Sequence, residues 1–271
     1  MTRTKIIDTV KKINEKVLLK GWVHSYRDKG KIIFFELRDV SGILQCVVWH
    51  EDKEVFSSAK KIGVEDVLEV VGKVNQRPKN QVKKEKATGM LEIIVEKIKI
   101  INKAKTLPFE INKDKFKEKV KEELRLKYRY LDLRRPKMKE KLIFRHRLIK
   151  FIRDFFDQKG FYEIETPILT KSTPEGARDY LVPSRLHPGK FYALPQSPQQ
   201  YKQLLMVAGI ENYFQIARCF RDEDPRSDRQ PEFTQLDMEM SFCQQKDILK
   251  ISEELLTKIV EKLSDSHLTF K

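Results

Sequence analysis

The stretch from Phe220 to Met240 carries the most informative set of side chains in the sequence. Three arginines lie among five acids between Phe220 and Glu232. The residues that follow alternate as in a strand whose apolar face is formed by Thr234, Leu236, Met238, Met240 and Phe242. The opposite face presents the polar groups of Gln235, Asp237, Glu239 and Ser241. A surface hairpin with compensating charges explains this mixture poorly, because the charges continue onto a strand whose other face is apolar.

A second polar group is predicted at the start of a helix from Pro198 to Gly209. Ser197 suits its N-cap, and Gln200 completes a capping box. Its apolar face comprises Tyr201, Leu204, Leu205 and Ala208. Gln199 and Lys202, three residues apart, share the opposite face. If this face lined a pocket, an amide and an ammonium beside a helix N-terminus would suit an anionic small molecule. An ordinary solvated helix face is the alternative.

A long helix must position these segments. Pro136 suits its first position, and Gly160 suits the cap after its last turn. Its apolar residues, between Leu142 and Phe156, cover roughly half of the circumference, which is wider than one core contact needs. A second packing surface, such as a subunit partner, and burial in one large core both fit this pattern. A strand from Gly160 to Pro167 and a polar loop from Thr173 to Tyr180 are predicted next; loops of this kind often hold functional groups.

The first hundred residues predict a small β domain. Strands are expected at Val17–Tyr26, Lys31–Arg38, Ile43–Trp49, Val67–Val74 and Leu91–Ile101, separated by turn signals. A short helix near Lys53–Lys61 can lie between the third and fourth strands. Five strands with one interposed helix are what an OB barrel requires, and that barrel commonly binds single-stranded nucleic acid. An SH3-like or split barrel also fits the pattern.

The segment from Lys103 to Arg135 is charged and contains no glycine. It predicts a hinge with a short helix. The charge run from Lys113 to Lys119 is interpreted as a solvated face.

The overall charge favours a polyanionic partner. The chain has 55 Lys and Arg against 40 Asp and Glu, a formal net charge of +15. Neutralising phosphates releases condensed counterions, although a lysine-rich solvated surface would give the same balance. Cys46, Cys219 and Cys243 form neither a metal-binding spacing nor a disulfide framework. With no signal peptide or membrane-spanning stretch, the sequence predicts a soluble cytoplasmic protein without a membrane partner.

Together the polar stretches resemble one protein family. Phe220 to Asp237 is similar to the second signature motif of class II aminoacyl-tRNA synthetases. The stretches 196–199 (Gln-Ser-Pro-Gln) and 175–180 (Glu-Gly-Ala-Arg-Asp-Tyr) are similar to the aspartate-specific branch, whereas asparaginyl and lysyl relatives differ there. Residues 186–192 and 128–136 also match bacterial-type members. The resemblance covers nearly the whole chain. It implies an α+β fold, with a five-stranded OB-fold barrel followed by an incomplete class II antiparallel-sheet catalytic domain.

The resemblance implies an enzyme that activates L-aspartate with ATP to aspartyl-adenylate and passes the aspartyl group to tRNA. Negative charge develops at the α-phosphorus, so a fixed guanidinium is the natural stabiliser. The implied catalytic residues are Arg221 and Glu223. The implied ATP site comprises Arg221, Asp222, Glu223 and Gln230, and the aspartate site comprises Glu175, Ser197, Gln199, Gln200, Tyr201, Lys202, Arg221 and Asp237. Mg²⁺ is expected with ATP, held mainly by the phosphates, with no metal site built from protein side chains.

The resemblance also assigns roles around the amino acid. Lys202 would pair with the side-chain carboxylate of aspartate and reject asparagine, which would leave a buried cation unpaired. Asp237, with Ser197 and Gln199, would hold the substrate ammonium. Glu175 lies in a loop that closes over the bound amino acid in the family.

In the barrel, Arg27, Phe34 and Gln45 match family positions that contact anticodon bases. An exposed aromatic ring and polar groups suit recognition of an RNA loop. Phe34 fits a core position equally well. The lysine-rich loop from Gln81 to Lys86 departs from the family pattern, so whether asparagine tRNA is also charged stays open.

The chain also departs from the family beyond its second motif. Family members carry a later glycine-rich motif with a second catalytic arginine, but here no Gly follows Gly209 and no Arg follows Arg229. The expectation is therefore an N-terminal part, inactive alone, of an enzyme that is a homodimer when intact. Its expected parts are an anticodon-binding domain at 1–104, a hinge at 105–135 and a truncated catalytic domain at 136–271, ending in an amphipathic helix from Asp247 to Leu263.

Two other functions fit parts of the sequence. One is a non-catalytic tRNA-binding protein with a vestigial synthetase domain. It would need none of the substrate residues retained here. The other is a free-standing asparagine-forming relative, which usually lacks the barrel.

Overall fold

The structure is a computed structural model that describes residues 1–112, 120–173, 175–224, 226 and 228–264. It divides into two compact units, Met1–Pro136 and Lys137–Lys271. Each unit has its own hydrophobic core. The predicted charge run from Lys113 to Lys119 lies outside the described residues.

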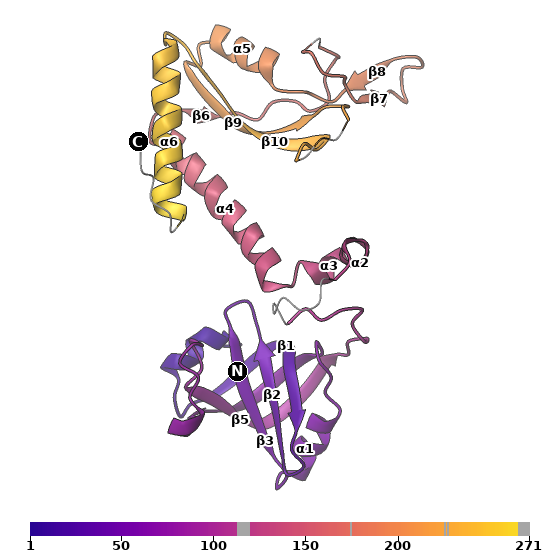
Figure 1. The fold of residues 1–271 in the computed structure, drawn as a ribbon, viewed down its shortest axis with the longest axis vertical. Coiled ribbons are helices and arrows are strands. Elements are labelled where there is room, and N and C mark those ends of the chain that lie inside the picture. The colour runs from indigo at the N-terminus through magenta and orange to yellow at the C-terminus, as the bar shows by residue number, and fades with distance from the viewer. Residues whose placement is uncertain (113–119, 174, 225, 227, 265–271) are drawn as a thin grey trace. The chain divides into compact units, whose positions relative to one another are not determined.

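The first unit is built on a closed five-stranded barrel (Figure 1). Its strands are β1 (Lys16–Asp28), β2 (Ile32–Arg38), β3 (Ile43–Trp49), β4 (Val67–Gln76) and β5 (Leu91–Asn102), with η1 (Ile6–Lys11), α1 (Lys53–Lys60) and η2 (Lys79–Gln81) between or before them. The order around the barrel is β1-β2-β3-β5-β4. This order, with α1 between the third and fourth strands, confirms the OB fold and excludes the SH3-like alternative.

Alternation along the strands builds the barrel core. In β2, Ile33, Phe35 and Leu37 are buried, whereas Phe34 lies half-buried on the outer face. Gly72 allows β4 and β5 to approach at an irregularity in their register, because a Cβ there would lie 2.3 Å from the carbonyl oxygen of Ile94.

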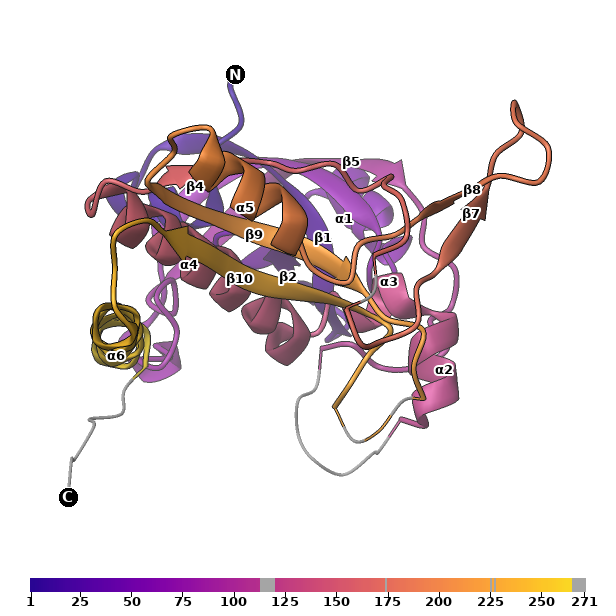
Figure 2. The same cartoon turned by 90° about the horizontal axis from the view of Figure 1, so that it is seen from above.

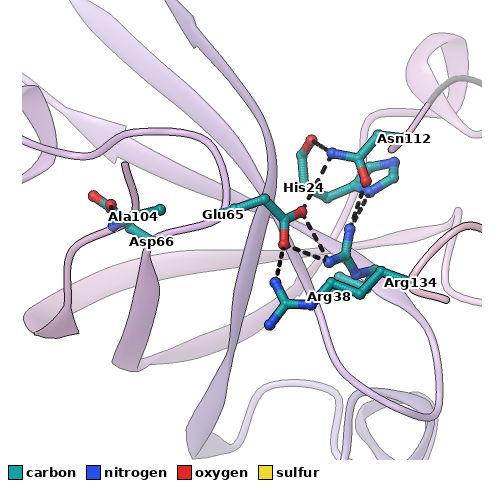
Figure 3. Close-up of polar contacts among 7 residues, drawn as sticks. All are labelled: His24, Arg38, Glu65, Asp66, Ala104, Asn112 and Arg134. Atoms are coloured by element: carbon teal, nitrogen blue, oxygen red, sulfur yellow. Dashed lines mark hydrogen bonds and ion pairs between the residues drawn. The ribbon is translucent and has the colours of Figure 1, made fainter. Parts of the chain in front are cut away.

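The connector after the barrel contains α2 (Glu122–Lys127) and α3 (Arg129–Asp132). Two consecutive acids before β4 tie it to the barrel (Figure 3). Glu65 accepts from the guanidinium of Arg134, at 2.7 Å, and from that of Arg38. Asp66 accepts from the backbone N–H of Ala104 at 2.8 Å. The connector is therefore part of the first compact unit.

The second unit packs helices on both faces of a three-stranded sheet (Figure 2). Its elements are α4 (Pro136–Asp157), β6 (Tyr162–Glu163), β7 (Leu181–Pro183), β8 (Phe191–Ala193), α5 (Gln199–Val207), β9 (Asn212–Phe220), β10 (Glu232–Met240) and α6 (Gln245–Leu263). The central pair β9–β10 is antiparallel, and the short β6 pairs parallel to β9. One sheet face packs on α4 and α6 through the cluster of Phe155, Phe156, Phe214, Met238 and Leu255. The helix α5 lies over the opposite face, where the polar residues of β10 point.

Several local predictions were wrong. The strand predicted from Gly160 to Pro167 is only two residues long, at β6. Phe242 lies beyond β10, is 97% exposed and has a left-handed backbone, so it does not belong to the apolar face. Leu142 and Phe144 of α4 are 52% and 45% exposed, so one large core does not bury this helix within a single chain.

The start of α5 agrees with the prediction only in part. The residue directly before the helix is Pro198, and Ser197 Oγ accepts from the Gln199 N–H at 3.3 Å, as expected of a capping serine, but Gln200 does not complete a capping box. The helix turns its polar side inward: Lys202 is buried, whereas Leu204 is 62% exposed.

Candidate active site

A buried lysine lies between two carboxylates on the polar face of β10. The Nζ of Lys202 donates to Asp237 Oδ1 at 2.9 Å and lies 3.2 Å from Glu239 Oε2. Burial alone would lower the pKa of Lys202, but the hydrogen bonds and charges of the two carboxylates raise it above its usual value. Lys202 is therefore a buried cation held in place by two carboxylates.

Two buried polar atoms near this cluster have no partner. Among the described residues, Arg221 Nε and Asp237 Oδ2 are the side-chain atoms that are buried without a hydrogen bond. An unsatisfied buried charged group costs about 1–3 kcal/mol or more. Native proteins satisfy nearly all such groups, so exceptions mark places where a ligand can complete the bonding.

Arg221 faces a polar cleft formed by the loop between β9 and β10. Its guanidinium lies over the ring of Phe233, 5.0 Å from the centroid, which fixes its orientation. The cleft has a volume of about 790 Å³. It is lined by Arg145, Arg218, Arg221, Glu223, Asp224, Asp228, Arg229, Gln230, Glu232, Phe233 and Thr234. Its four arginines are balanced by four acidic side chains, so contact with a phosphate would come from individual guanidinium groups such as Arg221 and not from an excess of positive charge.

The predicted ATP residues are divided between this cleft and a second one. Arg221, Glu223 and Gln230 line the first. Asp222 lines a neighbouring cavity of about 440 Å³, together with Glu223 and Arg178, and its backbone N–H donates to the carbonyl of Arg178 at 2.9 Å. Phe233 was not among the predicted site residues; it pairs with Cys219, two residues before Arg221, across the β9–β10 hairpin.

The loop that begins at Glu175 is held against the start of α5. Ser197 Oγ donates to Glu175 Oε2 at 2.7 Å. The side chain of Gln196 bonds both backbone groups of Ala177, at 3.1 and 2.9 Å, and also donates to Asp179. Gln196 is 2% exposed and was not among the predicted site residues. It appeared in the motif, but its structural partners lie 17 to 19 residues earlier.

The other predicted aspartate residues occupy different positions. Tyr201 shares a 2.8 Å hydrogen bond with Thr170, and Gln199 is half-buried beside Ser197. Gln200 is exposed on α5. Neither cavity described above is lined by Lys202 or Asp237.

One buried thiol connects the two parts of the site. Burial, followed by the charge of Asp237, raises the pKa of Cys219 to about 11, with Arg221 and Glu175 acting on it as well. These three charges, from the lysine cluster, the cleft and the loop, therefore surround a single side chain. Cys219 itself is a neutral core residue and not a nucleophile.

A separate pocket lies on the outer face of the barrel. It has a volume of about 420 Å³ and contains all three residues predicted to contact RNA: Arg27, Phe34 and Gln45. Its other wall comes from Arg77 and the loop at 80–83. Gln45 is bonded to Glu92 at 3.0 Å. The structure thus brings the predicted aromatic and polar groups together and places Phe34 outside the core.

Comparisons with known proteins match this geometry. The family model "tRNA synthetases class II (D, K and N)" matches residues 121–270, and that of an OB-fold nucleic acid binding domain matches residues 17–101. The chain belongs to the class II tRNA synthetases of the D, K and N group. The resemblance inferred from the motifs is therefore confirmed, as is the fold of barrel plus class II sheet.

Individual relatives support the aspartate branch. An aspartate–tRNA(Asp/Asn) ligase of Syntrophomonas wolfei is 59% identical over 92% of this chain, and an aspartate–tRNA ligase of Geobacillus kaustophilus is 57% identical over 92%. The chain spans 42% of the length of each. The crystal structure of an asparaginyl-tRNA synthetase from Pyrococcus horikoshii, complexed with asparaginyl-adenylate, has a TM-score of 0.80 at 30% identity. That match covers 93% of this chain and 56% of the solved one.

Within the described ranges, no helix combines the length and apolar character needed to cross a membrane. Over the same ranges, no three His, Cys, Asp or Glu side chains are grouped so that they could hold a metal ion.

Proposed function

We propose that this chain provides the anticodon-binding and substrate-binding parts of an aspartate–tRNA ligase. The observation that carries the proposal is the pair of buried, unpartnered atoms, Arg221 Nε and Asp237 Oδ2, of which the second belongs to the carboxylate paired with Lys202. A donor, an acceptor and a cation match the carboxylates and the ammonium of aspartate. The identity to aspartate–tRNA ligases supports this choice of amino acid.

The amino acid would be held at both ends. We propose that its ammonium completes the bonding of Asp237 Oδ2, with Ser197 and Gln199 nearby. Its side-chain carboxylate would pair with Lys202. Because Asp237 and Glu239 already contact this ammonium, the substrate carboxylate would take the place of Glu239 on it, and asparagine would bind less well because a neutral amide is a weaker acceptor for the ammonium. Glu175 is proposed to act through its loop, and Tyr201 and Gln200 through α5.

ATP would lie in the cleft around Arg221. The Arg221 guanidinium would contact the α-phosphate and the aspartate α-carboxylate, and it would stabilise the charge that develops as the carboxylate attacks and pyrophosphate leaves. Glu223, Asp222 and Gln230 are proposed to position the nucleotide. The arginines in the lining can contact a triphosphate, and Mg²⁺ would arrive with ATP and neutralise phosphate charge, which the four acids of the same lining make necessary. No step is assigned to protein ligands of that ion.

The barrel is proposed to bind the tRNA anticodon through Arg27, Phe34 and Gln45. The half-buried Phe34 ring offers a stacking surface, and the polar groups around it can reach base edges. Residues 105–135 would serve as the hinge. We further propose a cytoplasmic homodimer, in which the exposed Leu142 and Phe144 of α4 contact a second subunit.

Calorimetry with a non-hydrolysable aspartyl-adenylate analogue tests the substrate site in the 271-residue chain. We expect binding, loss of at least ~30-fold in affinity for Arg221→Ala, and little change for Lys150→Ala, an exposed residue on α4. Aspartate-dependent ATP–pyrophosphate exchange then tells whether these residues suffice for activation. RNA binding without analogue binding would instead support the non-catalytic tRNA-binding protein.

A further inference from the structure

The loop between β4 and β5 forms one wall of the barrel pocket and is anchored to the opposite wall. Asn80, Gln81, Val82 and Lys83 line the pocket from this loop, facing Arg27, Phe34 and Glu36 on the strands. Glu36 also accepts from Lys86 Nζ at 2.8 Å. One ion pair therefore connects the two walls.

The loop has a defined internal structure on which this ion pair acts. The Lys83 N–H donates to the carbonyl of Gly89, and the Gly89 N–H donates to that of Lys86, at 3.1 and 2.8 Å. A Cβ at Gly89 would lie 1.8 Å from the Lys83 oxygen, so this close approach requires glycine. Thr88 Oγ1 donates to the Ile43 carbonyl, which fixes the end of the loop on β3. Lys86 belongs to this bonded part of the loop, since its N–H donates to the Lys83 carbonyl and its carbonyl accepts from Gly89.

The ion pair is better sheltered than a surface pair. The Glu36 side chain is 15% exposed and that of Lys86 34%. Ser25 Oγ donates to the second carboxylate oxygen of Glu36 at 3.0 Å. Burial raises the pKa of Glu36, but the hydrogen bonds and charge of Lys86 and the Ser25 hydroxyl outweigh it and hold the pKa below its usual value. Glu36 is therefore a charged acceptor at neutral pH.

We propose that the Glu36–Lys86 ion pair is a positioning device for RNA: it sets the width of the barrel pocket and thereby its discrimination between anticodon bases. The proposal rests on RNA binding by this pocket, as argued above. Lys86 acts through Glu36 and the loop, and its ammonium is already neutralised. Its contribution is consequently to base selectivity and not to phosphate attraction.

Binding of RNA hairpins to the 271-residue chain tests the proposal. The probes are a hairpin with the aspartate anticodon and hairpins with single-base changes in it, measured across a range of salt concentrations. For Lys86→Met we expect affinity for the aspartate hairpin to fall about 5- to 10-fold, as for loss of a charge-assisted hydrogen bond. Affinity for the hairpins with single-base changes should fall less. The ratio of affinities between the aspartate hairpin and the changed hairpins therefore decreases, while the salt dependence of binding stays unchanged.

The matched control is Lys84→Met, two residues away on the same loop and exposed. If it contacts phosphate, all hairpins weaken together and the slope of log K against log salt falls by about 0.7. The double variant Glu36→Lys/Lys86→Glu, which keeps the net charge, should restore discrimination. Hydrogen exchange at the Lys83 and Gly89 amides should quicken in Lys86→Met and recover in the double variant.

Two failures are distinguishable. If the unaltered chain binds hairpins but Lys86→Met keeps full discrimination, the positioning role is overturned while RNA binding stands. If the unaltered chain binds no hairpin, the proposed RNA function and the positioning role fail together.

Discussion

Two buried carboxylates in this molecule have opposite bonding. Glu65 of the first unit is 1% exposed at its side chain, and both its oxygens receive guanidinium donors, from Arg38 and Arg134 (Figure 3). Asp237 of the second unit is bonded through one oxygen to Lys202, while its other oxygen is buried without a partner. A complete set of bonds stabilises a fold, whereas an incomplete set is suited to a ligand.

The backbone at each carboxylate shows the same difference. Glu65 has a φ of 67°, a left-handed conformation that costs energy for a residue other than glycine. Its ion pairs and the Asn112 bonds to Arg38 and His24 offset that cost. Asp237 lies in the regular strand β10, paired with Gln215 of β9. The first carboxylate is thus held by its partners, and the second by a strand that needs none of its side-chain bonds.

The largest effect is expected from Glu65→Gln. The change leaves two partly buried guanidinium groups without their anion, and we expect the first unit to lose about 3 kcal/mol of unfolding free energy. Both tryptophans, Trp22 and Trp49, belong to this unit, so their fluorescence during urea unfolding measures it.

The control for this change is Glu96→Gln, which breaks an exposed ion pair with Lys16 in the same unit. It should change the unfolding free energy by no more than about 0.5 kcal/mol. Equal effects of the two substitutions would mean that the Glu65 cluster contributes no more than a surface pair.

The second largest effect is expected from Asp237→Asn, which should change stability little and ligand binding strongly. Lys202 keeps Glu239 and an amide oxygen as acceptors, so unfolding of the second unit should change by less than about 1 kcal/mol. Affinity for the aspartyl-adenylate analogue should fall at least ~30-fold, because the acceptor for the ammonium loses its charge. Hydrogen exchange measures the former and calorimetry the latter. A loss of stability as large as that of Glu65→Gln, with binding retained, would place Asp237 among the structural carboxylates.

The third effect is a difference in pH dependence between the units. Despite their burial, hydrogen bonds and positive neighbours hold the pKa of Asp66 and of Asp132 below the usual 3.8. Their stabilisation is complete above the unfolded pKa and is lost as the pH falls through the folded values. Glu92, whose pKa is raised by burial, has the opposite effect: it destabilises the first unit when ionised, and this cost disappears as the pH falls.

Lys202 gives the second unit an alkaline dependence in addition. Its pKa is raised, so its stabilisation is complete below the usual 10.5 and is lost as the pH rises through the folded value. In thermal unfolding, both units should therefore weaken as the pH falls below about 4, the second through Asp179 and Glu254, whose pKa values are also lowered, and the second unit should also weaken as the pH rises above 10.5. In the Asp66→Asn variant, the stability of the first unit should fall less steeply at acid pH, and its alkaline behaviour should not change. If stability falls as steeply at acid pH as in the unaltered chain, Asp66 does not contribute to the acid dependence.

Local patterns were sufficient to predict much of this fold. The period-two alternation predicted the five barrel strands with ends within about two residues, because each strand buries one face. Pro136 and Gly160 likewise marked the ends of α4, since each acts through its own backbone.

The parts that could not be predicted depend on distant partners. Considered by itself, the sequence of α5 predicted that its apolar side would be buried. Lys202 is buried instead because its carboxylates come from β10, 35 residues later for Asp237. The Ser197 hydroxyl has a second role besides the start of α5: it accepts from the Gln199 N–H at 3.3 Å and also donates to Glu175, 22 residues earlier. Motif similarity identified these residues as a group, and only the fold shows which bonds they make and which atom of Asp237 is left unbonded.

The smallest expected effect is that of Phe233→Leu. In each cluster a guanidinium lies over an aromatic ring, Arg134 over Trp22 at 5.3 Å and Arg221 over Phe233 at 5.0 Å. Arg134 is also held by Glu65, whereas Arg221 has a buried nitrogen without a partner. Orientation of Arg221 should therefore depend more on its ring, and loss of the cation–π contact should cost about 0.5–1 kcal/mol.

We expect this cost to appear in ligand binding. Affinity of Phe233→Leu for the aspartyl-adenylate analogue should fall about 3-fold, with unfolding of the second unit nearly unchanged. Phe233→Tyr keeps a ring of the same size and should bind as the unaltered chain does. If the Phe233→Leu and Phe233→Tyr variants bind the analogue equally well, the ring does not orient Arg221, and the guanidinium must be positioned by the β9–β10 loop alone.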